Sequence, residues 1–162
     1  MTDADFDRVL REHGPALRRL AASWERDAAA REDLLQEILF ALWRALPRFR
    51  GDSSEKTFVF RVAHNRALTH RSRARKDGHD LDEAMHVADP RPSPEEAAGS
   101  AQKLERLMRA LPNLPVPLRQ VLILSLEGLS RSEIAEVVGI TENNAAVRLS
   151  RARKAVLEEM SS

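Results

Sequence analysis

The side chains with the most specific chemistry in this sequence lie in GLSRSEIAEVVGITENNAAVRLSRARKAV, at positions 128–156. Helical spacing leaves four of them on or near the outside of the second helix expected there: Asn143, Asn144, Arg148 and Arg151. Asn pairs bidentately with adenine, and Arg pairs with guanine or with a phosphate. The chemistry that these residue types predict is hydrogen bonding to DNA.

Two short helices must position these side chains. Ser130 and Glu133 form a capping box, which predicts the start of the first helix. Gly139 permits the left-handed backbone that ends it, and Thr141 can cap the second. The expected inward faces are Ile134, Ala135 and Val138, then Ala145, Leu149, Ala152 and Val156. This layout predicts a helix–turn–helix whose second helix enters the major groove. The alternative, an αα-corner without a ligand, is disfavoured by the basic second helix.

A second set of candidate binding residues lies in RVAHNRALTHRSRARK (61–76), which holds six Arg or Lys and no Asp or Glu. The whole chain has 26 basic and 25 acidic residues, so this excess is local. The preceding RFRGDSS supplies an aromatic, a glycine and hydroxyl groups in a loop. Such residues beside a cationic helix suit unpaired bases and their phosphates. We expect the first half of this helix to carry Phe58, Val59, Val62 and Ala63 inward. The alternative to nucleic-acid binding is a solvated amphipathic helix.

The helix expected at 31–46 has two different faces. One is an apolar stripe that packs into a core: Leu34, Leu35, Ile38, Leu39, Leu42 and Leu46. The other carries Asp33, Gln36, Glu37, Phe40 and Arg44, within about 100° of one another. A large aromatic opposite the core indicates an anchor for a protein partner. A merely solvated face remains the alternative for these residues.

The sequence predicts an all-α fold, because helical periodicity is common and strand signals are nearly absent. Helices are expected at 3–28, 31–46, 56–76, 99–111, 115–127, 130–138 and 142–159. Residues 77–98 hold seven acidic residues, one Arg and three prolines, a composition typical of a linker. We therefore expect two small helical domains, 1–76 and 99–162, joined by a flexible acidic linker. Fully extended, 22 residues span up to about 70–80 Å.

Composition excludes several classes of protein. Cysteine is absent, so disulfides and thiolate metal sites are excluded. No apolar run approaches the roughly 20 residues of a membrane span, and the N-terminus lacks a signal-peptide pattern, so a cytoplasmic protein is expected. The histidines at 64, 70, 79 and 86 are scattered, without a carboxylate–histidine constellation or a phosphate-binding loop. We expect no enzymatic activity, no metal and no cofactor.

The order of these motifs resembles the extracytoplasmic-function (ECF) sigma factors, the smallest members of the bacterial sigma-70 family. EDLLQEILFALWRALPRFRGDSS is similar to that family's regions 2.1–2.2 and the loop after them, and FVFRVAHNRALTHRSR to regions 2.3–2.4. LPVPLRQVLILSLEGLSRSEIAEVVGITENNAAVRLSRARKAV resembles region 4. The resemblance covers most of residues 10–76 and 104–158. It implies a factor that recruits core RNA polymerase to a promoter and helps to melt the duplex.

The resemblance also implies a role for each set of residues. The residues implied to dock on the coiled coil of the polymerase β′ subunit are Asp33, Gln36, Glu37 and Phe40. The residues implied to form the pocket for a base flipped from the −10 element are Phe49, Gly51, Asp52, Ser53 and Asn65. Those implied to hold the adjoining strand are Arg61, Arg66, Arg71 and Arg73. The residues implied to recognise the −35 element are Asn143, Asn144, Arg148 and Arg151. The implied partners are the β′ and β subunits of core RNA polymerase, promoter DNA and an anti-sigma factor.

The sequence departs from the family pattern at four positions. Glu55 stands where the family usually has an aromatic residue and Phe58 where it usually has Trp, so strand opening is expected to differ. Ala146 and Val147 replace a typical Lys and Ser, which predicts a different promoter preference. The alternative function is a sigma-like module that sequesters an anti-sigma factor without initiating transcription. The intact basic stretch favours initiation, since a decoy does not need it.

Overall fold

The computed structural model describes residues 2–76 and 99–161, and every regular element in these two ranges is helical. The elements are α1 (Asp3–Trp24), α2 (Ala28–Ala45), the 3-10 turn η1 (Leu46–Arg48), α3 (Glu55–Lys76), α4 (Ser100–Ala110), the 3-10 turn η3 (Leu111–Asn113), α5 (Val116–Leu126), α6 (Arg131–Val138) and α7 (Glu142–Ser161). The all-α prediction is confirmed. The linker predicted at 77–98 lies outside the described residues.

Capping side chains set the boundaries of the first two helices. The helix expected at 3–28 ends at Trp24, because Glu25 takes an extended conformation. The Asp27 side chain then accepts the backbone N–H of Ala30 at 2.9 Å and caps α2. An acidic N-cap satisfies one of the free N–H groups of a first turn. As a result α2 starts at Ala28, three residues before the expected position.

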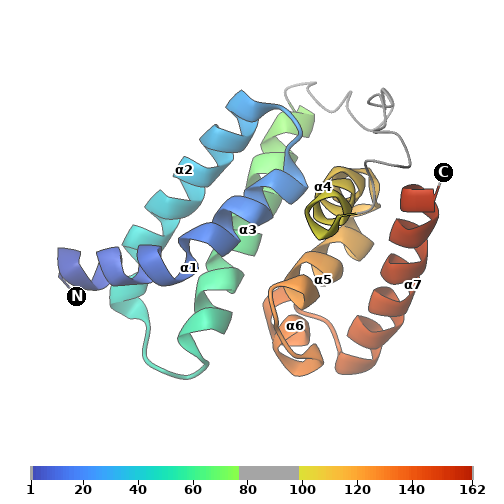
Figure 1. The fold of residues 1–162 in the computed structure, drawn as a ribbon. Coiled ribbons are helices and arrows are strands. Elements are labelled where there is room, and N and C mark those ends of the chain that lie inside the picture. The colour runs from blue at the N-terminus through green and yellow to red at the C-terminus, as the bar shows by residue number, and fades with distance from the viewer. Residues whose placement is uncertain (1, 77–98, 162) are drawn as a thin grey trace.

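Helices α1 to α3 form the first group of helices, drawn from blue to green in Figure 1. The apolar stripe predicted for α2 is buried at Leu34, Leu35, Ile38 and Leu42, continues to Leu46 in η1, and is half-buried at Leu39. In α3 the predicted inward residues all lie in the core or pack against it, but Phe60 was not among them. Phe60 is fully buried, whereas Phe58 and Val62 are half-buried. The reason is that α3 packs against α2 on one side and α6 on another, which widens its buried arc.

Helices α4 to α7 form the second group, and α6 with α7 makes the helix–turn–helix. The capping box of Ser130 and Glu133 is present, and Gly139 ends α6 with φ at 81°. The inward residues of α7 are buried as predicted. In α6 the buried valine is Val137, not the expected Val138, which is half-buried. Helix α6 is packed between α3 and the pair α5 and α7, so more than one of its faces is covered.

The two groups of helices lie in contact with each other (Figure 1), and their buried apolar residues form a continuous cluster. The guanidinium of Arg19 donates two hydrogen bonds, of 2.7 and 2.9 Å, to the carboxylate of Glu127. The buried Arg119 places its guanidinium 5.5 Å from the ring centroid of Trp24. A second interface between the groups joins α3 to α6. Within the described ranges, no helix is both long and apolar enough to cross a membrane.

Candidate functional site

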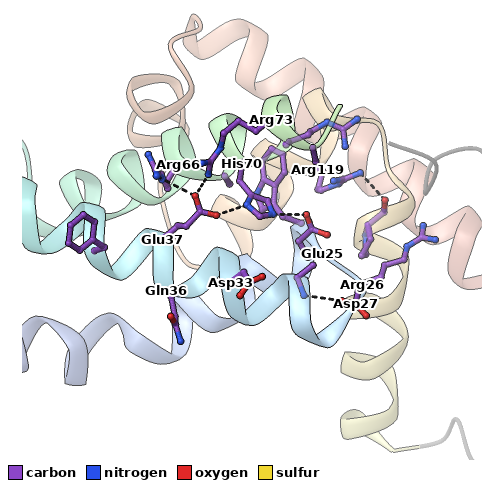
Figure 2. A pocket seen from close by; sticks show the side chains of 17 residues that line it. Glu25, Arg26, Asp27, Asp33, Gln36, Glu37, Arg66, His70, Arg73 and Arg119 are labelled. Atoms are coloured by element: carbon purple, nitrogen blue, oxygen red, sulfur yellow. Dashed lines mark hydrogen bonds and ion pairs between the residues drawn. The ribbon is translucent and has the colours of Figure 1, made fainter. Parts of the chain in front are cut away.

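A groove of about 940 Å³ lies between the end of α1, helix α2 and the second half of α3, with Pro112 and Arg119 contributing from the second group of helices (Figure 2). It is lined by the docking candidates Asp33, Gln36, Glu37 and Phe40, and by the basic candidates Arg66, Arg71 and Arg73. The sequence assigned these two sets to different partners. The structure places them along one groove.

The docking candidates on α2 are accessible apart from Glu37. Asp33 and Gln36 are exposed, and the ring of Phe40 is 61% exposed. Trp43, which the sequence reasoning missed, is 42% exposed and meets the ring of Phe6 edge-on at 5.1 Å. Its position three residues after Phe40 was the available signal, since residues three apart are neighbours on a helix surface. We call Asp33, Gln36, Glu37 and Phe40 the docking face.

The carboxylate of Glu37 is turned toward α3 and is held there by three side chains (Figure 2). Arg66 and Arg73 both donate to Oε1, the former at 3.3 Å, and Nδ1 of His70 lies 2.6 Å from Oε2. Partial burial acts to raise the pKa of the Glu37 carboxyl, but hydrogen bonds from His70 and Arg73 outweigh it, so this pKa is lowered from its ordinary value. We call these four residues the Glu37 cluster.

The role of His70 was missed by the sequence reasoning. Its second ring nitrogen, Nε2, lies 3.1 Å from a carboxylate oxygen of Glu25, at the end of α1. His70 therefore links the carboxylates of two helices to α3. Arg66, His70 and Arg73 are spaced at i, i+4 and i+7, which places them on one face of a helix and was a usable signal. Their acidic partners lie in other parts of the chain, so no local sequence pattern predicts these contacts.

The candidates for base capture lie in the loop before α3 and along α3. Phe49 is half-buried, and its ring centroid is 4.9 Å from that of Phe58. Gly51 has φ at 81°, and Asp52 is exposed. The hydroxyl of Ser53 donates to the backbone oxygen of Ser54 at 3.3 Å. Asn65 is exposed, about 15 Å along the helix from Glu55 by its rise per residue.

The first half of α3 is in contact with α6. Arg61, a candidate for holding the DNA strand, forms an ion pair of 2.5 Å with Glu136. The hydroxyl of Thr57 donates to Glu133 at 3.0 Å. A hydrogen bond from the backbone of Ser130 is the main reason that the pKa of Glu133 is lowered. In this arrangement the second group of helices therefore occupies part of the surface that the sequence assigned to DNA.

The candidates for reading the −35 element lie on α7. Asn143, Asn144 and Arg151 are exposed, and Arg148 is half-buried. The Thr141 side chain accepts the backbone N–H of Asn144 at 3.1 Å, as expected for a cap. The four side chains thus lie within the first half of α7, a helix whose opposite face is buried.

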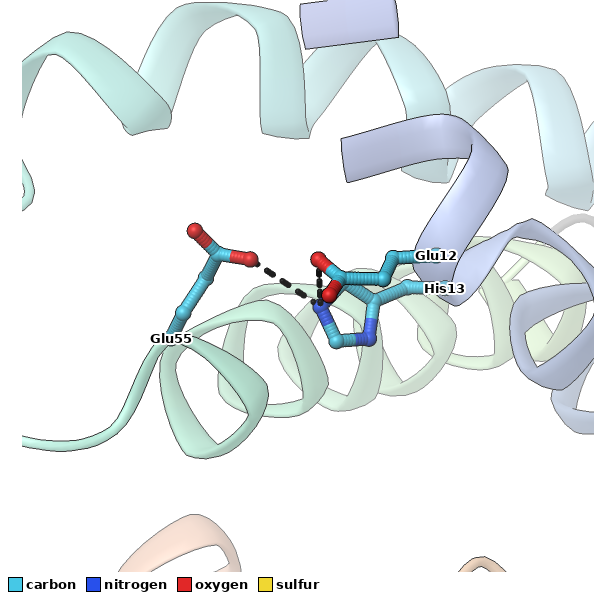
Figure 3. Close-up of side chains that lie close together, drawn as sticks. All are labelled: Glu12, His13 and Glu55. Carbon is cyan, nitrogen blue, oxygen red and sulfur yellow. Dashed lines mark hydrogen bonds and ion pairs between the residues drawn. The ribbon is translucent and has the colours of Figure 1, made fainter. Parts of the chain in front are cut away.

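Glu12, His13 and Glu55 form another cluster, between α1 and the start of α3 (Figure 3). Nε2 of His13 lies 3.2 Å from Glu55, and the three ligand atoms lie within 4.8 Å of one another. Arg8 also donates to both carboxylate oxygens of Glu55, at 3.1 and 2.7 Å. Since a guanidinium already balances this carboxylate, we interpret the cluster as an ion-pair network that fastens α1 to α3. Glu55, the departure from the family pattern, is thus a partner of α1.

His64 is buried in the interior, 2% exposed, beside the ring of Trp24 at a centroid distance of 6.2 Å. Burial lowers its pKa to about 4, because desolvation disfavours the charged imidazole. His64 is therefore neutral near pH 7. The sequence reasoning treated it only as one of several scattered histidines.

Comparison with known protein families gives two matches in chain order. Residues 9–77 match the model described as sigma-70 region 2, and residues 104–156 match the model described as sigma-70, region 4. The RNA polymerase sigma factor CnrH of Cupriavidus metallidurans is 30% identical over 157 residues, covering 91% of this chain and 82% of the relative. The RNA polymerase sigma-H factor of Pseudomonas aeruginosa is 30% identical over 161 residues, with 93% and 83% covered.

Solved structures show the same fold. The sigma factor RpoE from Bartonella quintana, in complex with the anti-sigma factor NepR, superposes with a TM-score of 0.76 at 27% identity, covering 97% of both chains. CnrH in complex with the cytosolic domain of CnrY superposes with a TM-score of 0.69 at 23% identity, covering 99% of this chain and 90% of that one. Both likenesses extend over the two groups of helices.

Proposed function

The chain belongs to the sigma-70 family as an ECF sigma factor, and from this premise we propose which surfaces carry out its function in promoter-directed initiation of transcription. The two family models match the two groups of helices separately. We assign core polymerase binding and the −10 element to the first group, residues 1–76. We assign the −35 element to the second, residues 99–162, and no covalent chemistry to either.

The observation that carries the polymerase assignment is the exposed aromatic side of α2. Phe40 is 61% exposed on a helix whose opposite side is buried at Leu34, Leu35, Ile38 and Leu42. Trp43 is also exposed, and the guanidinium of Arg44 lies 5.9 Å from the ring of Phe40. Aromatic residues are frequent energetic centres of protein interfaces. We propose that the docking face binds the coiled coil of the polymerase β′ subunit.

The assignment to DNA rests on the charge of α3 and α7. Arg66, Arg71 and Arg73 line the groove from α3, and Arg148 and Arg151 lie on α7. Arg donors suit phosphates and guanine, and the exposed Asn143 and Asn144 suit base edges. We propose that α3, with the loop before it, holds the melted −10 strand, and that α7 reads the −35 duplex.

We also propose that an anti-sigma protein regulates this chain. The support is its likeness to RpoE of Bartonella quintana, whose structure was solved in complex with the anti-sigma factor NepR. The same likeness keeps open the second function, a module that sequesters such a partner without initiating transcription. The two functions differ in what the chain does with core polymerase.

The experiment that tests the function is run-off transcription with core RNA polymerase, the purified chain and a library of genomic promoters. We expect specific transcripts that depend on the added chain. Transcripts that are the same with and without the chain would argue for the sequestering module instead.

The docking assignment predicts that Phe40→Ala weakens binding to core polymerase by about tenfold to a hundredfold, as expected for a central interface aromatic. The fold should persist, because Phe40 is exposed. Binding is measured by surface plasmon resonance on immobilised core polymerase. Leu157→Ala is the matched control, because Leu157 is 62% exposed on α7. Equal affinity of Phe40→Ala and wild type would remove α2 as the docking site.

A further inference from the structure

The outward face of α7 has an apolar residue at its centre. Val147 is 39% exposed, while the same helix buries Ala145, Leu149, Ala152 and Val156. At 3.6 residues per turn, Val147 points about 170° away from the mean direction of these four residues. Helix α7 packs on α4, α5 and α6, at the side of the molecule away from α1 and α2 (Figure 1). Val147 is therefore directed into solvent, on the face with which the proposed reading helix meets DNA.

Polar side chains lie one turn before and one turn after Val147. Asn143 and Arg151 are both exposed, and residues four apart are neighbours on a helix surface. Four residues of a helix rise about 6 Å, and stacked base pairs are about 3.4 Å apart. Adjacent members of this row can therefore reach base pairs within two steps of each other. We call Asn143, Val147 and Arg151 the outer row of α7.

The side chains beside Val147 are short. Ala146 precedes it, and the exposed Ser150 follows it by three residues. Short neighbours let the helix backbone come close to the bases, which a side chain of the length of valine requires. Arg148 is half-buried and points only about 70° away from the mean direction of the buried residues of α7. Arg148 therefore suits the phosphates beside the groove, whereas the outer row suits the base edges.

Valine has no hydrogen-bonding group in its side chain, so it recognises an apolar feature of a base. In the major groove that feature is the C5-methyl group of thymine. Cytosine has no methyl group there and presents an amino donor instead. Covering this donor with valine removes it from water without a partner, which costs free energy. Val147 therefore favours thymine over cytosine at the base that it covers.

We propose that Val147 is a specificity-determining residue that contacts the C5-methyl group of a thymine in the −35 element. Asn143, one turn before it, then pairs with an adenine within two base pairs of this thymine. The contact rests on the proposed function, because α7 must enter the major groove to make it. It adds the chemical identity of one base to the proposed role of α7.

The test removes the methyl group from the DNA and the valine from the protein. The probe is the promoter duplex with the highest run-off yield, bound by the full chain together with core polymerase. Each thymine of its −35 element, on either strand, is replaced in turn by deoxyuridine, which lacks only the C5-methyl group. We expect one replacement to weaken binding by the wild-type chain about threefold to fivefold, the effect of one buried methyl group. A −35 element without such a thymine would contradict the proposal.

The variant Val147→Ser should bind the thymine and deoxyuridine duplexes with affinities within about 1.5-fold, because no contact remains to be lost. Leu157→Ser is the matched control, since it makes a similar change at an exposed apolar residue farther along α7 and should keep the wild-type ratio. An effect of the methyl group on DNA shape alone would leave Val147→Ser as sensitive as the wild type, which contradicts the contact.

A second measurement uses only the wild-type chain and so does not depend on the folding of a variant. At the position of the sensitive thymine, 5-methylcytosine should bind better than cytosine, again by about threefold to fivefold. Equal affinities for the two bases would contradict the contact, because the methyl group is what distinguishes them.

The outcomes separate this contact from the function on which it rests. If the chain directs specific transcripts but no deoxyuridine replacement weakens binding, the contact is wrong and the function stands. If the chain directs no specific transcripts, the proposed function is wrong and the contact falls with it. If Val147→Ser weakens binding to core polymerase without DNA as much as binding to the promoter, Val147 contacts a protein and the proposal is wrong. Circular dichroism melting shows whether each variant is folded at the temperature of the binding measurements.

Discussion

At His64, burial decides whether the side chain is charged. The imidazole lies in the interior beside Trp24, and its pKa is lowered to about 4 from an ordinary value of 6.5. An unfolded chain takes up this proton near pH 6.5, whereas the folded chain resists it until about pH 4. The neutral His64 side chain therefore makes its full contribution to the free energy of unfolding above pH 6.5, and this contribution is lost as the pH falls toward 4.

This linkage predicts that His64→Leu makes the free energy of unfolding less dependent on pH. Between pH 7 and pH 5, the His64 proton should cost the wild-type protein about 2 kcal/mol that the variant does not lose. Urea unfolding at the two pH values measures the difference. The pKa values of Glu37, Glu55 and Glu133 are lowered from 4.5, so their protonation falls below this window. Equal losses in the variant and the wild type would contradict the prediction.

The sequence predicted the types of the candidate functional side chains but not the residues that they contact. The spacing of Asp33, Gln36, Glu37 and Phe40 predicted a shared face of α2, and three of the four are exposed. That Glu37 turns instead to α3 depends on how α2 packs on α3. No local pattern contains that information, since His70 and Arg73 lie more than thirty residues away in the chain. The sequence likewise did not predict the pairing of Glu55 with Arg8, because these two residues are also far apart in the chain.

At the scale of elements, the turn between α6 and α7 sets the direction of the helix proposed to read DNA. Gly139 has φ at 81°, in the left-handed region that other residues avoid. No atom lies within 4 Å of the position that a Cβ would occupy, so the cost of a side chain here is that of the backbone alone. The turn thus depends on glycine for its conformation and not for close packing.

The turn predicts that Gly139→Ala lowers the free energy of unfolding by about 1–2 kcal/mol, the cost of a left-handed conformation. Gly139→Asn is the matched variant, and it should lose less, because Asn tolerates this conformation better than Ala. Both are measured by urea denaturation followed by circular dichroism. A larger loss in the Asn variant than in the Ala variant would show that space, and not the backbone, limits this position.

Element boundaries were predictable wherever a side chain caps a helix. Ser130 and Glu133 fixed the start of α6 within one residue, because the capping box is a local interaction. The cap by Asp27 is equally local, yet the expected boundary between the first two helices missed it. The buried face was harder to predict for a helix that packs against neighbouring helices on two sides. Phe60 and Val137 are buried because α3 and α6 pack on each other, and this packing joins distant parts of the sequence.

At the scale of the whole molecule, the packing of the two groups of helices does not fit simultaneous binding of both promoter elements. Positions −10 and −35 are about 25 base pairs apart, which is on the order of 80 Å of duplex. A compact chain of this length has a radius of gyration of about 15 Å. If α3 binds the −10 element and α7 the −35 element, as we propose, the contact between α3 and α6 must break before both helices can reach DNA. Arg61 illustrates the conflict, because it is paired with Glu136.

The polar contacts across this interface predict that it opens when acidic side chains of α6 are neutralised. Glu136 forms an ion pair with Arg61, worth about 0.2–1 kcal/mol, and Glu133 accepts a hydrogen bond from Thr57, worth about 1 kcal/mol. Glu133→Gln with Glu136→Gln should shift the balance toward the open arrangement about twofold to tenfold. Gln also retains the capping box of α6. Because the chain has no cysteine, Asp7→Cys with Ser150→Cys provides two exposed labelling sites for energy transfer.

We expect the double Gln variant to show lower energy transfer than the wild type at low salt. The two proteins should converge at about 0.5 M salt, where exposed ion pairs are screened. Glu158→Gln is the control, because Glu158 is exposed on α7 and forms no ion pair within the described residues. Core polymerase together with promoter DNA should lower the transfer in every variant, since the proposed binding to both promoter elements requires separation. Unchanged transfer in the double Gln variant would mean that the apolar cluster, and not these polar contacts, holds the two groups of helices together.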